Sequence, residues 1–161
     1  MENRNTRIIV IVTLVVIILS GAAYLYHRSR LSTAVSELEI TFDSVNVRSL
    51  QLLPSPEANL TLIYVANNTR NIDFRITLDG ELYYGSNFIT PLTVENARIR
   101  GNGLSTFQMD VTITGSILNT IDPENRNEYI LQGELVATSR FLGIIPVTVT
   151  KSLSNYDPGQ N

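Results

Sequence analysis

The sequence predicts an all-β protein, an antiparallel β-sandwich preceded by a single transmembrane α-helix. Three observations carry this prediction. Near its start the chain of 161 residues holds an uncharged run of nineteen residues, 8–26, twelve of which are Ile, Leu or Val. After this run, apolar and polar residues alternate with the period of two that is typical of half-buried strands. Turn-forming residues recur between these segments, so we expect about seven or eight short strands and almost no further helix.

The first element is the apolar run 8–26. Its nineteen residues, at a helical rise of about 1.5 Å, would span roughly 28 Å, close to the hydrocarbon thickness of a bilayer. Its twelve large aliphatic side chains favour insertion by about 4–7 kcal/mol. Tyr24 and Tyr26 lie where an interfacial aromatic belt would form, and His27 and Arg28 follow at the headgroups. The segment has no polar face, so a buried core helix is the poorer interpretation.

Two interpretations of the apolar run stay open: a cleaved signal peptide and an uncleaved membrane anchor. Arg4 and Arg7 precede it and Ser20-Gly21-Ala22 offers a small-x-small cleavage pattern, as in a signal peptide. The run nevertheless continues through Tyr26 to the length of a full span, which favours an uncleaved anchor.

The orientation in the membrane is only weakly encoded, because arginines flank the run on both sides. The single lysine, the absence of cysteine and two acceptor sequons, which begin at Asn59 and Asn67, favour an outside domain. We therefore expect a single-pass protein of the cell membrane with an extracytoplasmic soluble domain. Asn59 and Asn67 are its candidate glycosylation sites.

Beyond the anchor the period of two defines the sandwich. Four segments are expected: a tail with the transmembrane helix over 1–30, a polar linker over 31–36, the sandwich over 37–154 and a polar tail over 155–161. A shift of phase at Asp43-Ser44 predicts a bulge. The strand over 60–65 carries apolar residues on both faces, which indicates burial on both sides. The expected strands cover residues 37–47, 60–65, 72–78, 82–84, 92–99, 107–113, 129–138 and 144–153.

Turn signals separate these strands. Asp79-Gly80 predicts a type I′ hairpin, because glycine adopts positive φ without steric cost. Residues 101–103 and 141–143 predict two further turns, and Asn67 is expected to end a strand, because Asn closes Asx-turns. The apolar spacing over 117–121 fits one helical turn that would cover an open end of the core.

The strand over 107–113 has the clearest alternation of the chain. Its apolar members Phe107, Met109, Val111 and Ile113 share one side of a two-residue period, so they should face the opposite sheet.

Composition excludes several classes of function. The chain has no cysteine, no tryptophan and one histidine, His27, at the predicted membrane edge. This excludes thiol catalysis, disulfides, Cys/His zinc sites and histidine-based triads in the soluble part. Without Glu2, Arg4 and Arg7 the 12 basic and 15 acidic residues become 10 and 14, and the arginines are scattered. Nucleic-acid binding requires a clustered basic face, so we expect no nucleic-acid partner.

Two sets of acidic residues receive an ordinary structural interpretation. Residues 122–128 are rich in oxygen ligands but lack the central glycine and the spacing of a calcium loop, so a solvated turn is expected. Asp73, Asp79 and Asp110 lie on outward strand positions or turns. Nothing nearby in the sequence would raise the pKa of these carboxyls, as general acid catalysis requires.

One aromatic group could form a binding patch. Tyr83, Tyr84 and Phe88 lie close together in the sequence, but sandwich cores and edges use such side chains routinely, so we expect them to pack. We therefore expect no catalytic residue, metal site or cofactor, and a non-enzymatic protein.

A set of short motifs runs through the sandwich in a fixed order. They are Ile40-x-Phe42, Val45-x-Val47, the run Leu60-x-Leu62-Ile63-Tyr64-Val65 before Asn67, the stretch from Ile72 to Leu82, and Gln132-Gly133-Glu134-Leu135. From about Val35 to Leu153 this order resembles the late-embryogenesis-abundant group 2 domain, also called the water-stress and hypersensitive-response domain. Where that family has Asn-Pro-Asn, this chain has Asn67-Asn68-Thr69. The resemblance implies a seven-stranded immunoglobulin-like sandwich related to fibronectin type III, often behind one membrane helix and without catalytic residues.

The function expected from this resemblance is a role in desiccation or stress tolerance at the cell envelope. The partners expected are the lipid bilayer, through residues 8–26, and other envelope proteins. The alternative is a subunit of a surface assembly, pilin-like or archaellar-stator-like, that binds other proteins through its β-domain. No Gly or Ala precedes the apolar run to mark the leader cleavage of a pilin, which counts against that alternative.

Overall fold

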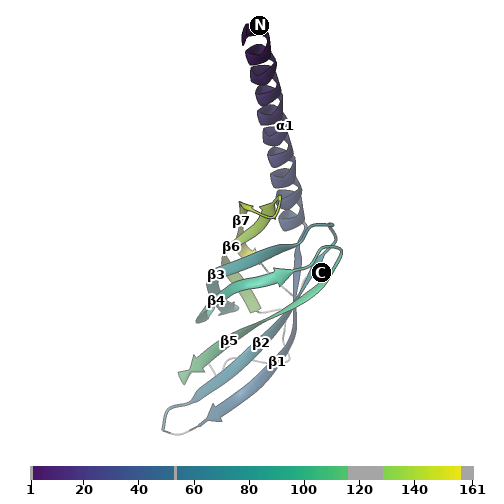
Figure 1. Ribbon diagram of the computed structural model, residues 1–161. Helices are drawn as coiled ribbons and strands as arrows, with labels where there is room; N and C mark the ends of the chain where they lie inside the picture. Colours follow the sequence, from purple (N-terminus) through teal and green to yellow (C-terminus); the bar gives the residue numbers. More distant parts are fainter. Residues whose placement is uncertain (1, 53, 116–128, 157–161) are drawn as a thin grey trace.

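The computed structural model describes residues 2–52, 54–115 and 129–156, and its longest element is one N-terminal helix (Figure 1). Helix α1 runs from Glu2 to Ser36, 35 residues without interruption. The expected polar linker over 31–36 is therefore wrong, because these residues form the last turns of α1. Leu31, Ala34 and Val35 are spaced i, i+3 and i+4, so they share one helix face, and that face is buried.

Seven antiparallel strands follow among the described residues and form two sheets (Figure 1). Sheet A has three strands in the order β1-β2-β5, and sheet B has four in the order β4-β3-β6-β7. The predicted sandwich-like arrangement of antiparallel strands behind one apolar helix is thus confirmed, but the strands are longer than expected, at 11–13 residues each. The strands are β1 (Glu39–Gln51), β2 (Glu57–Asn68), β3 (Phe74–Tyr84), β4 (Asn87–Ile99), β5 (Gly103–Thr114), β6 (Tyr129–Phe141) and β7 (Ile145–Tyr156).

The core lies between the two sheets and follows the predicted alternation most closely in β5. Phe107, Met109, Val111 and Ile113 are buried, whereas the residues between them are exposed. The bulge expected at Asp43-Ser44 is also present, as a register shift in the pairing of β1 with β2.

Strand β2 is buried on its inner face, but on its outer face Ile63 and Val65 are only half-buried, so the expected burial on both sides holds in part. Leu62 and Tyr64 are buried on the inner face. On the outer face Thr61 is also buried, and its hydroxyl donates to Asp110 at 2.7 Å. Arg48 pairs with the same carboxylate at 3.0 Å, so polar side chains of β1 and β5 cover the outer face of the central strand.

The hairpin predicted at Asp79-Gly80 is wrong. Strand β3 runs straight through these residues, and the expected return strand over 82–84 is its last part. The chain instead turns at Gly85, which has a φ of 58°, and continues into β4.

A glycine is needed at position 80 because strands β3 and β6 approach each other closely there, and not because the chain turns. Gly80 lies directly opposite Gly133 in the pairing of β3 with β6. A Cβ on Gly80 would lie 2.3 Å from the carbonyl oxygen of Gln132, closer than any real Cβ contact. A missing side chain permits such an approach of backbones, and the sequence pattern cannot tell it from a turn signal.

Strand β7 extends to Tyr156, two residues beyond the expected end of the sandwich. The helical turn predicted over 117–121, the solvated turn over 122–128 and residues 157–161 of the polar tail lie outside the described residues. The turns predicted at 101–103 and 141–143 are confirmed.

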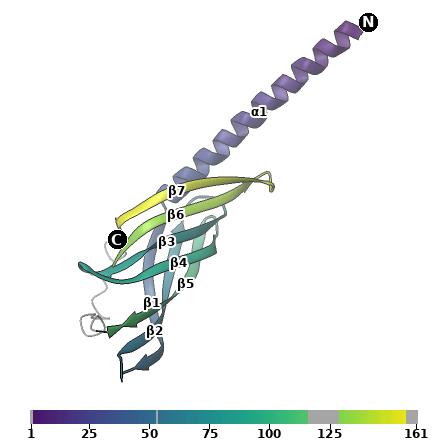
Figure 2. The same cartoon turned by 90° about the vertical axis from the view of Figure 1, so that its left-hand side faces the viewer.

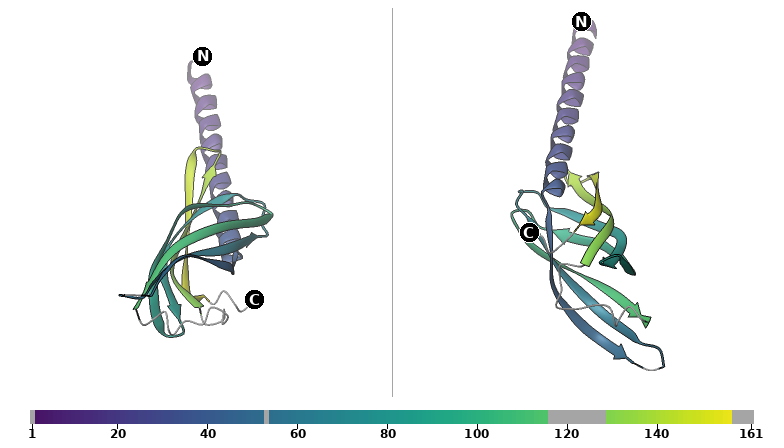
Figure 3. Two further views of the ribbon diagram at one scale, coloured as in Figure 1. Left: turned by 90° about the horizontal axis from the view of Figure 1, so that it is seen from below. Right: turned by 180° about the vertical axis from the view of Figure 1, so that it is seen from behind.

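Sheet A extends further from α1 than sheet B does. The ends of β1, β2 and β5 that lie far from α1 extend past sheet B, which Figure 3 shows in its right-hand view. We call the part of sheet A formed by Val47–Gln51 and its partner residues on β2 the far end of sheet A. Val47 and Leu50 are 62% and 59% exposed there.

We expect Gly80→Ala to destabilise the sandwich by at least about 2 kcal/mol, because the added methyl group overlaps the backbone of β6. Denaturant unfolding of the full chain in detergent, followed by circular dichroism, measures this loss. Gly103→Ala is the matched control, since its Cβ would meet nothing closer than 3.8 Å. Equal stability of the two variants would contradict the close-approach explanation.

Candidate membrane interface

The surface of α1 upstream of the sandwich is apolar on every side. From Ile8 to Leu19 its large aliphatic side chains are 48–65% exposed. The stretch Arg7–Ser36 is long and apolar enough to cross a membrane, and its most apolar part has no contact that buries it in the protein. The core helix of a soluble protein would be mostly covered, whereas a membrane anchor and a signal sequence both share these properties. Burial of this surface in lipid would remove a large apolar area from water.

The C-terminal end of α1 packs into the core of the sandwich. Leu31 is fully buried, and Ala34 and Val35 are each 1% exposed. They join the same hydrophobic cluster as Leu38 and Ile40, the residues that lead into β1. Along α1, exposed apolar side chains are followed within a few residues by side chains that are buried in the core. One continuous helix therefore joins the apolar run to the core.

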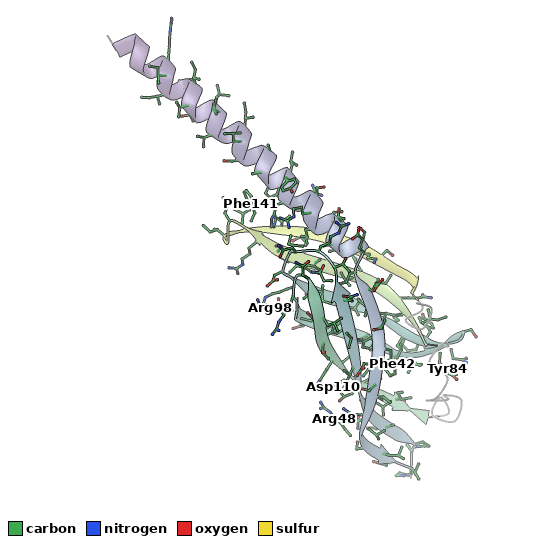
Figure 4. All side chains as sticks on the ribbon, turned by 90° about the vertical axis from the view of Figure 1, so that its right-hand side faces the viewer. Phe42, Arg48, Tyr84, Arg98, Asp110 and Phe141 are labelled. Carbon is green, nitrogen blue, oxygen red and sulfur yellow. The ribbon has the colours of Figure 1, made fainter. Side chains whose placement is uncertain are left out.

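A hairpin of sheet B lies beside α1 above this junction. Strands β6 and β7 pass beside the C-terminal part of the helix, and their turn points to the same side as its N-terminal half (Figure 2). The ring of Phe141 contacts that of Tyr24 edge-on at 5.9 Å and that of His27 at 5.7 Å (Figure 4). The His27 Nε2 atom also lies 3.2 Å from the Ser139 hydroxyl. The only histidine of the chain therefore serves in packing β6 against the helix.

The C-terminal end of α1 is capped by the only lysine of the chain. The Nζ atom of Lys151, on β7, donates to the carbonyl oxygens of Val35 at 3.3 Å and Ser36 at 3.2 Å. These carbonyls have no partner within the helix, and a cation there also interacts favourably with the helix dipole. Burial lowers the pKa of Lys151 from its ordinary value.

The β2–β3 turn holds the helix end from the other side. The Arg70 guanidinium forms a two-pronged ion pair with Glu37, and this hydrogen bonding holds the pKa of the Glu37 carboxyl below its usual value. Arg30 donates to the carbonyl oxygen of Asn71 at 2.7 Å. Both arginines thus tie the turn between the sheets to α1.

The turn itself is organised by Asn68, which the sequence analysis did not single out. Its side chain is 1% exposed, and Nδ2 donates to the carbonyl oxygens of Ile72 at 2.9 Å and Arg100 at 3.1 Å. Its Oδ1 accepts from the Arg70 amide at 3.0 Å. Asn67, which was expected to end the strand, lies one residue earlier on the outer face. Adjacent asparagines in the sequence do not reveal which of them is buried.

An open polar groove of about 650 Å³ lies beside β3, β4 and β6. Asp73 lines it and accepts from Arg98 at 2.9 Å and from the Gly101 amide at 2.8 Å. These donors hold the pKa of Asp73 below its usual value, which is the wrong direction for a general acid. The groove is further lined by Phe74, Arg75, Asn96, Thr138, Ser139 and Arg140.

The two candidate glycosylation sites both lie half-buried on β2. The Asn59 Nδ2 atom donates to Ser49 at 2.9 Å and to Glu57 at 3.2 Å. The Asn67 Nδ2 atom donates to Glu39 at 3.2 Å. Glycosylation of either residue stays a prediction.

The remaining candidate residues are dispersed. Asp79 and Asp110 lie exposed on β3 and β5, on different sheets. Tyr84 is buried in the core, and Tyr83 packs edge-on against Phe88 at 5.7 Å, which confirms the packing interpretation of the aromatic group. Within the described ranges, which omit 116–128, no three His, Cys, Asp or Glu residues gather as metal ligands would.

Comparison with known proteins finds only distant structural similarities. No known family model matches the chain, and no curated protein sequence matches it. The structure is similar to the solution structure of a candidate late embryogenesis abundant (LEA) protein, with a TM-score of 0.36 and 14% identity over 84% of each chain. It is also similar to the crystal structure of a protein from Archaeoglobus fulgidus, with a TM-score of 0.33 and 10% identity over 73% of this chain and 97% of that one. Identities this low transfer no function to the chain.

We expect Leu31→Ala to lower the free energy of unfolding of the sandwich by about 2–5 kcal/mol, although residue 31 lies in the helix. The substitution leaves a cavity where α1 meets the core. Ser32→Ala, on the exposed side of the same turn, is the control and should change stability by less than about 0.5 kcal/mol. Denaturant titration of the full chain in detergent tests both. A neutral Leu31→Ala would mean that the helix end is not part of the core.

Proposed function

We propose that this protein is a single-pass membrane protein that holds a non-enzymatic β-sandwich close to the bilayer. The observation that carries the proposal is the uninterrupted helix α1, whose bare apolar surface continues into the buried face of Leu31 and Val35. The apolar run continues past the cleavage pattern at Ser20-Gly21-Ala22 through Tyr26, to the length of a full span. This supports an uncleaved span over residues 8–26 rather than a signal sequence.

The sandwich is of the fibronectin type III kind in our proposal. In the constant-type immunoglobulin arrangement the fourth strand joins the sheet of the first, second and fifth strands. Here β4 pairs with β3, which leaves β1, β2 and β5 as a separate sheet of three. This partition of the strands supports the fold implied by the sequence motifs.

We place the sandwich outside the cell and assign it a role in protecting the envelope during water stress. The sequence motifs of the late-embryogenesis-abundant group 2 kind support this role. The absence of cysteine from the chain is compatible with an oxidising exterior. No catalytic residues are assigned, and the hydrogen bonds from Arg98 and the Gly101 amide lower the pKa of Asp73, the acidic residue that lines the polar groove.

A second candidate function is a subunit of a surface assembly. It is favoured by the far end of sheet A and by Leu52, which follows it directly: Val47, Leu50 and Leu52 are 59–66% exposed. Apolar side chains at the end most distant from the anchor would suit contact with another envelope protein. Pull-down of a defined partner that depends on these three residues would favour this candidate.

The anchor predicts that Val15→Arg combined with Val16→Arg releases the protein from membranes. Each central arginine costs about 2.5–3.5 kcal/mol, so the pair cancels the insertion free energy of the apolar run. Carbonate washing of isolated membranes measures the release. The same two arginines placed at the exposed positions Thr93 and Thr106 are the control and should leave the protein integral. A mature chain that begins near Ala23 would overturn the anchor.

The stress role predicts that the full chain protects vesicles during drying. We expect vesicles that carry the protein to retain more trapped dye after drying and rehydration than bare vesicles, because a sandwich fixed at the headgroups keeps neighbouring bilayers apart. A peptide of residues 1–36 in the same vesicles is the control for the anchor alone. Equal dye retention with the peptide and with the full chain would contradict a protective role of the sandwich.

A further inference from the structure

The turn between β6 and β7 is unusually apolar for a tip exposed to water. It reads Phe-Leu-Gly-Ile-Ile over residues 141–145. Leu142 and Ile144 are 77% and 79% exposed, the two highest values among the large apolar side chains described. Ile145 is exposed as well, at 47%. Hairpin tips of this length normally carry Asn, Asp or Gly.

The backbone of the turn makes this choice of residues still less favourable. Leu142 has a φ of 51° and Gly143 a φ of 75°, and the amide of Ile144 donates to the carbonyl oxygen of Phe141 at 3.2 Å. Two positive φ angles in succession define a type I′ turn, for which Asn-Gly is the preferred pair. A leucine in the left-handed region is sterically disfavoured. Leu142 is thus disfavoured both by its conformation and by its contact with water, so its apolar side chain calls for another explanation.

The position of the turn along α1 supplies that explanation. Phe141 contacts Tyr24 and His27, so the turn lies level with the residues where the apolar run ends. The turn projects away from the sandwich on the same side as the N-terminal half of the helix (Figure 2). If residues 8–26 fill the hydrocarbon layer, Leu142 and Ile144 reach the boundary between headgroups and acyl chains.

The arginines near the turn also suit a position at the level of the lipid headgroups. Arg140 is exposed immediately before Phe141, and Arg28 and Arg30 follow the apolar run on the helix. Arg140 also lines the polar groove, together with Arg75, which lies opposite Thr138 on β6. Arginines at the headgroup level around an apolar tip are the usual pattern of an interfacial membrane contact.

We propose that the β6–β7 turn is a second contact with the lipid bilayer, in which Leu142 and Ile144 insert at the headgroup level. This inference rests on the proposed function, because the anchor sets the depth of the turn. A helix alone leaves the protein free to rotate about the helix axis and to tilt. A second point of insertion, beside the helix, fixes both and presents sheet A and its far end away from the membrane.

The depth of the turn can be measured with single cysteines, because the chain has none of its own. Each full-length variant is labelled with an environment-sensitive fluorophore and reconstituted in vesicles of phosphatidylcholine and phosphatidylglycerol that carry nitroxide lipids. Ile144→Cys reports on the turn, Leu14→Cys on the span and Leu50→Cys on the far end of sheet A. We expect shallow nitroxides to quench the label at 144 strongly and the label at 50 weakly.

The label at 14 separates the failure of this inference from the failure of the anchor. Quenching at 14 by deep nitroxides, with 144 no more quenched than 50, would overturn the second contact and leave the anchor in place. The absence of quenching at 14 would overturn the anchor itself. A label at 144 that is shielded from aqueous iodide but not quenched by lipid nitroxides would show a protein partner, or a second copy, on the turn, and this would also overturn the inference.

A polar turn provides the matched variant. Leu142→Asn with Ile144→Ser keeps the turn, since Asn favours positive φ, but removes its apolar surface. With the fluorophore at Ile145→Cys, we expect this pair to abolish most of the quenching by shallow nitroxides. Val47→Asn with Leu50→Ser, an equally polar change at the far end of sheet A, should leave that quenching unchanged. Loss of quenching in both pairs would overturn the assignment to the turn.

Discussion

The continuity of helix α1 with the hydrophobic core is the constraint on which the rest of the structure depends. A continuous α-helix contains no hinge, because a backbone hydrogen bond fixes every interior residue. Leu31, Ala34 and Val35 place the last turns inside the sandwich, and only Glu37 and Leu38 separate α1 from β1. The orientation of the sandwich relative to the apolar run is therefore decided by packing. No flexible linker between Ser36 and β1 allows the two to move independently.

This constraint explains the group of polar contacts at the C-terminal end of α1. A helix end that enters a core brings unpaired carbonyl groups with it, and these need partners. Lys151 supplies them from β7, while Arg70 and Arg30 fasten the β2–β3 turn to the same end. The partly buried ammonium group is tolerated because it meets two carbonyl oxygens. Lys151 thus has a structural reason to be the one lysine in a chain whose other basic residues are arginine.

The sequence was most informative where the structure is locally determined. The alternation of Phe107 to Ile113 predicts the inner face of β5 because strand geometry repeats every two residues. The apolar run predicts its own exposure because no polar face limits it. The sequence failed where contacts join distant residues: Lys151 lies 116 residues from Val35, and no local pattern connects them. The prediction of a hairpin at Gly80 failed for the same reason, since the backbone that approaches this glycine belongs to β6.

The edges of the two sheets bear on which partners such a sandwich can take. An exposed, regular edge strand invites addition of a strand from another protein. Edge strand β1 is interrupted by two register shifts, and edge strands β4 and β7 contain Pro91 and Pro146, which cannot donate to a further strand. Helix α1 also contacts β7. Strand addition is therefore disfavoured at these three edges. The fourth edge strand, β5, pairs with β2 in unbroken register over Gly103–Thr114 and contains no proline, so a protein partner of sheet A would add a strand at β5 or contact the side chains at the far end of sheet A.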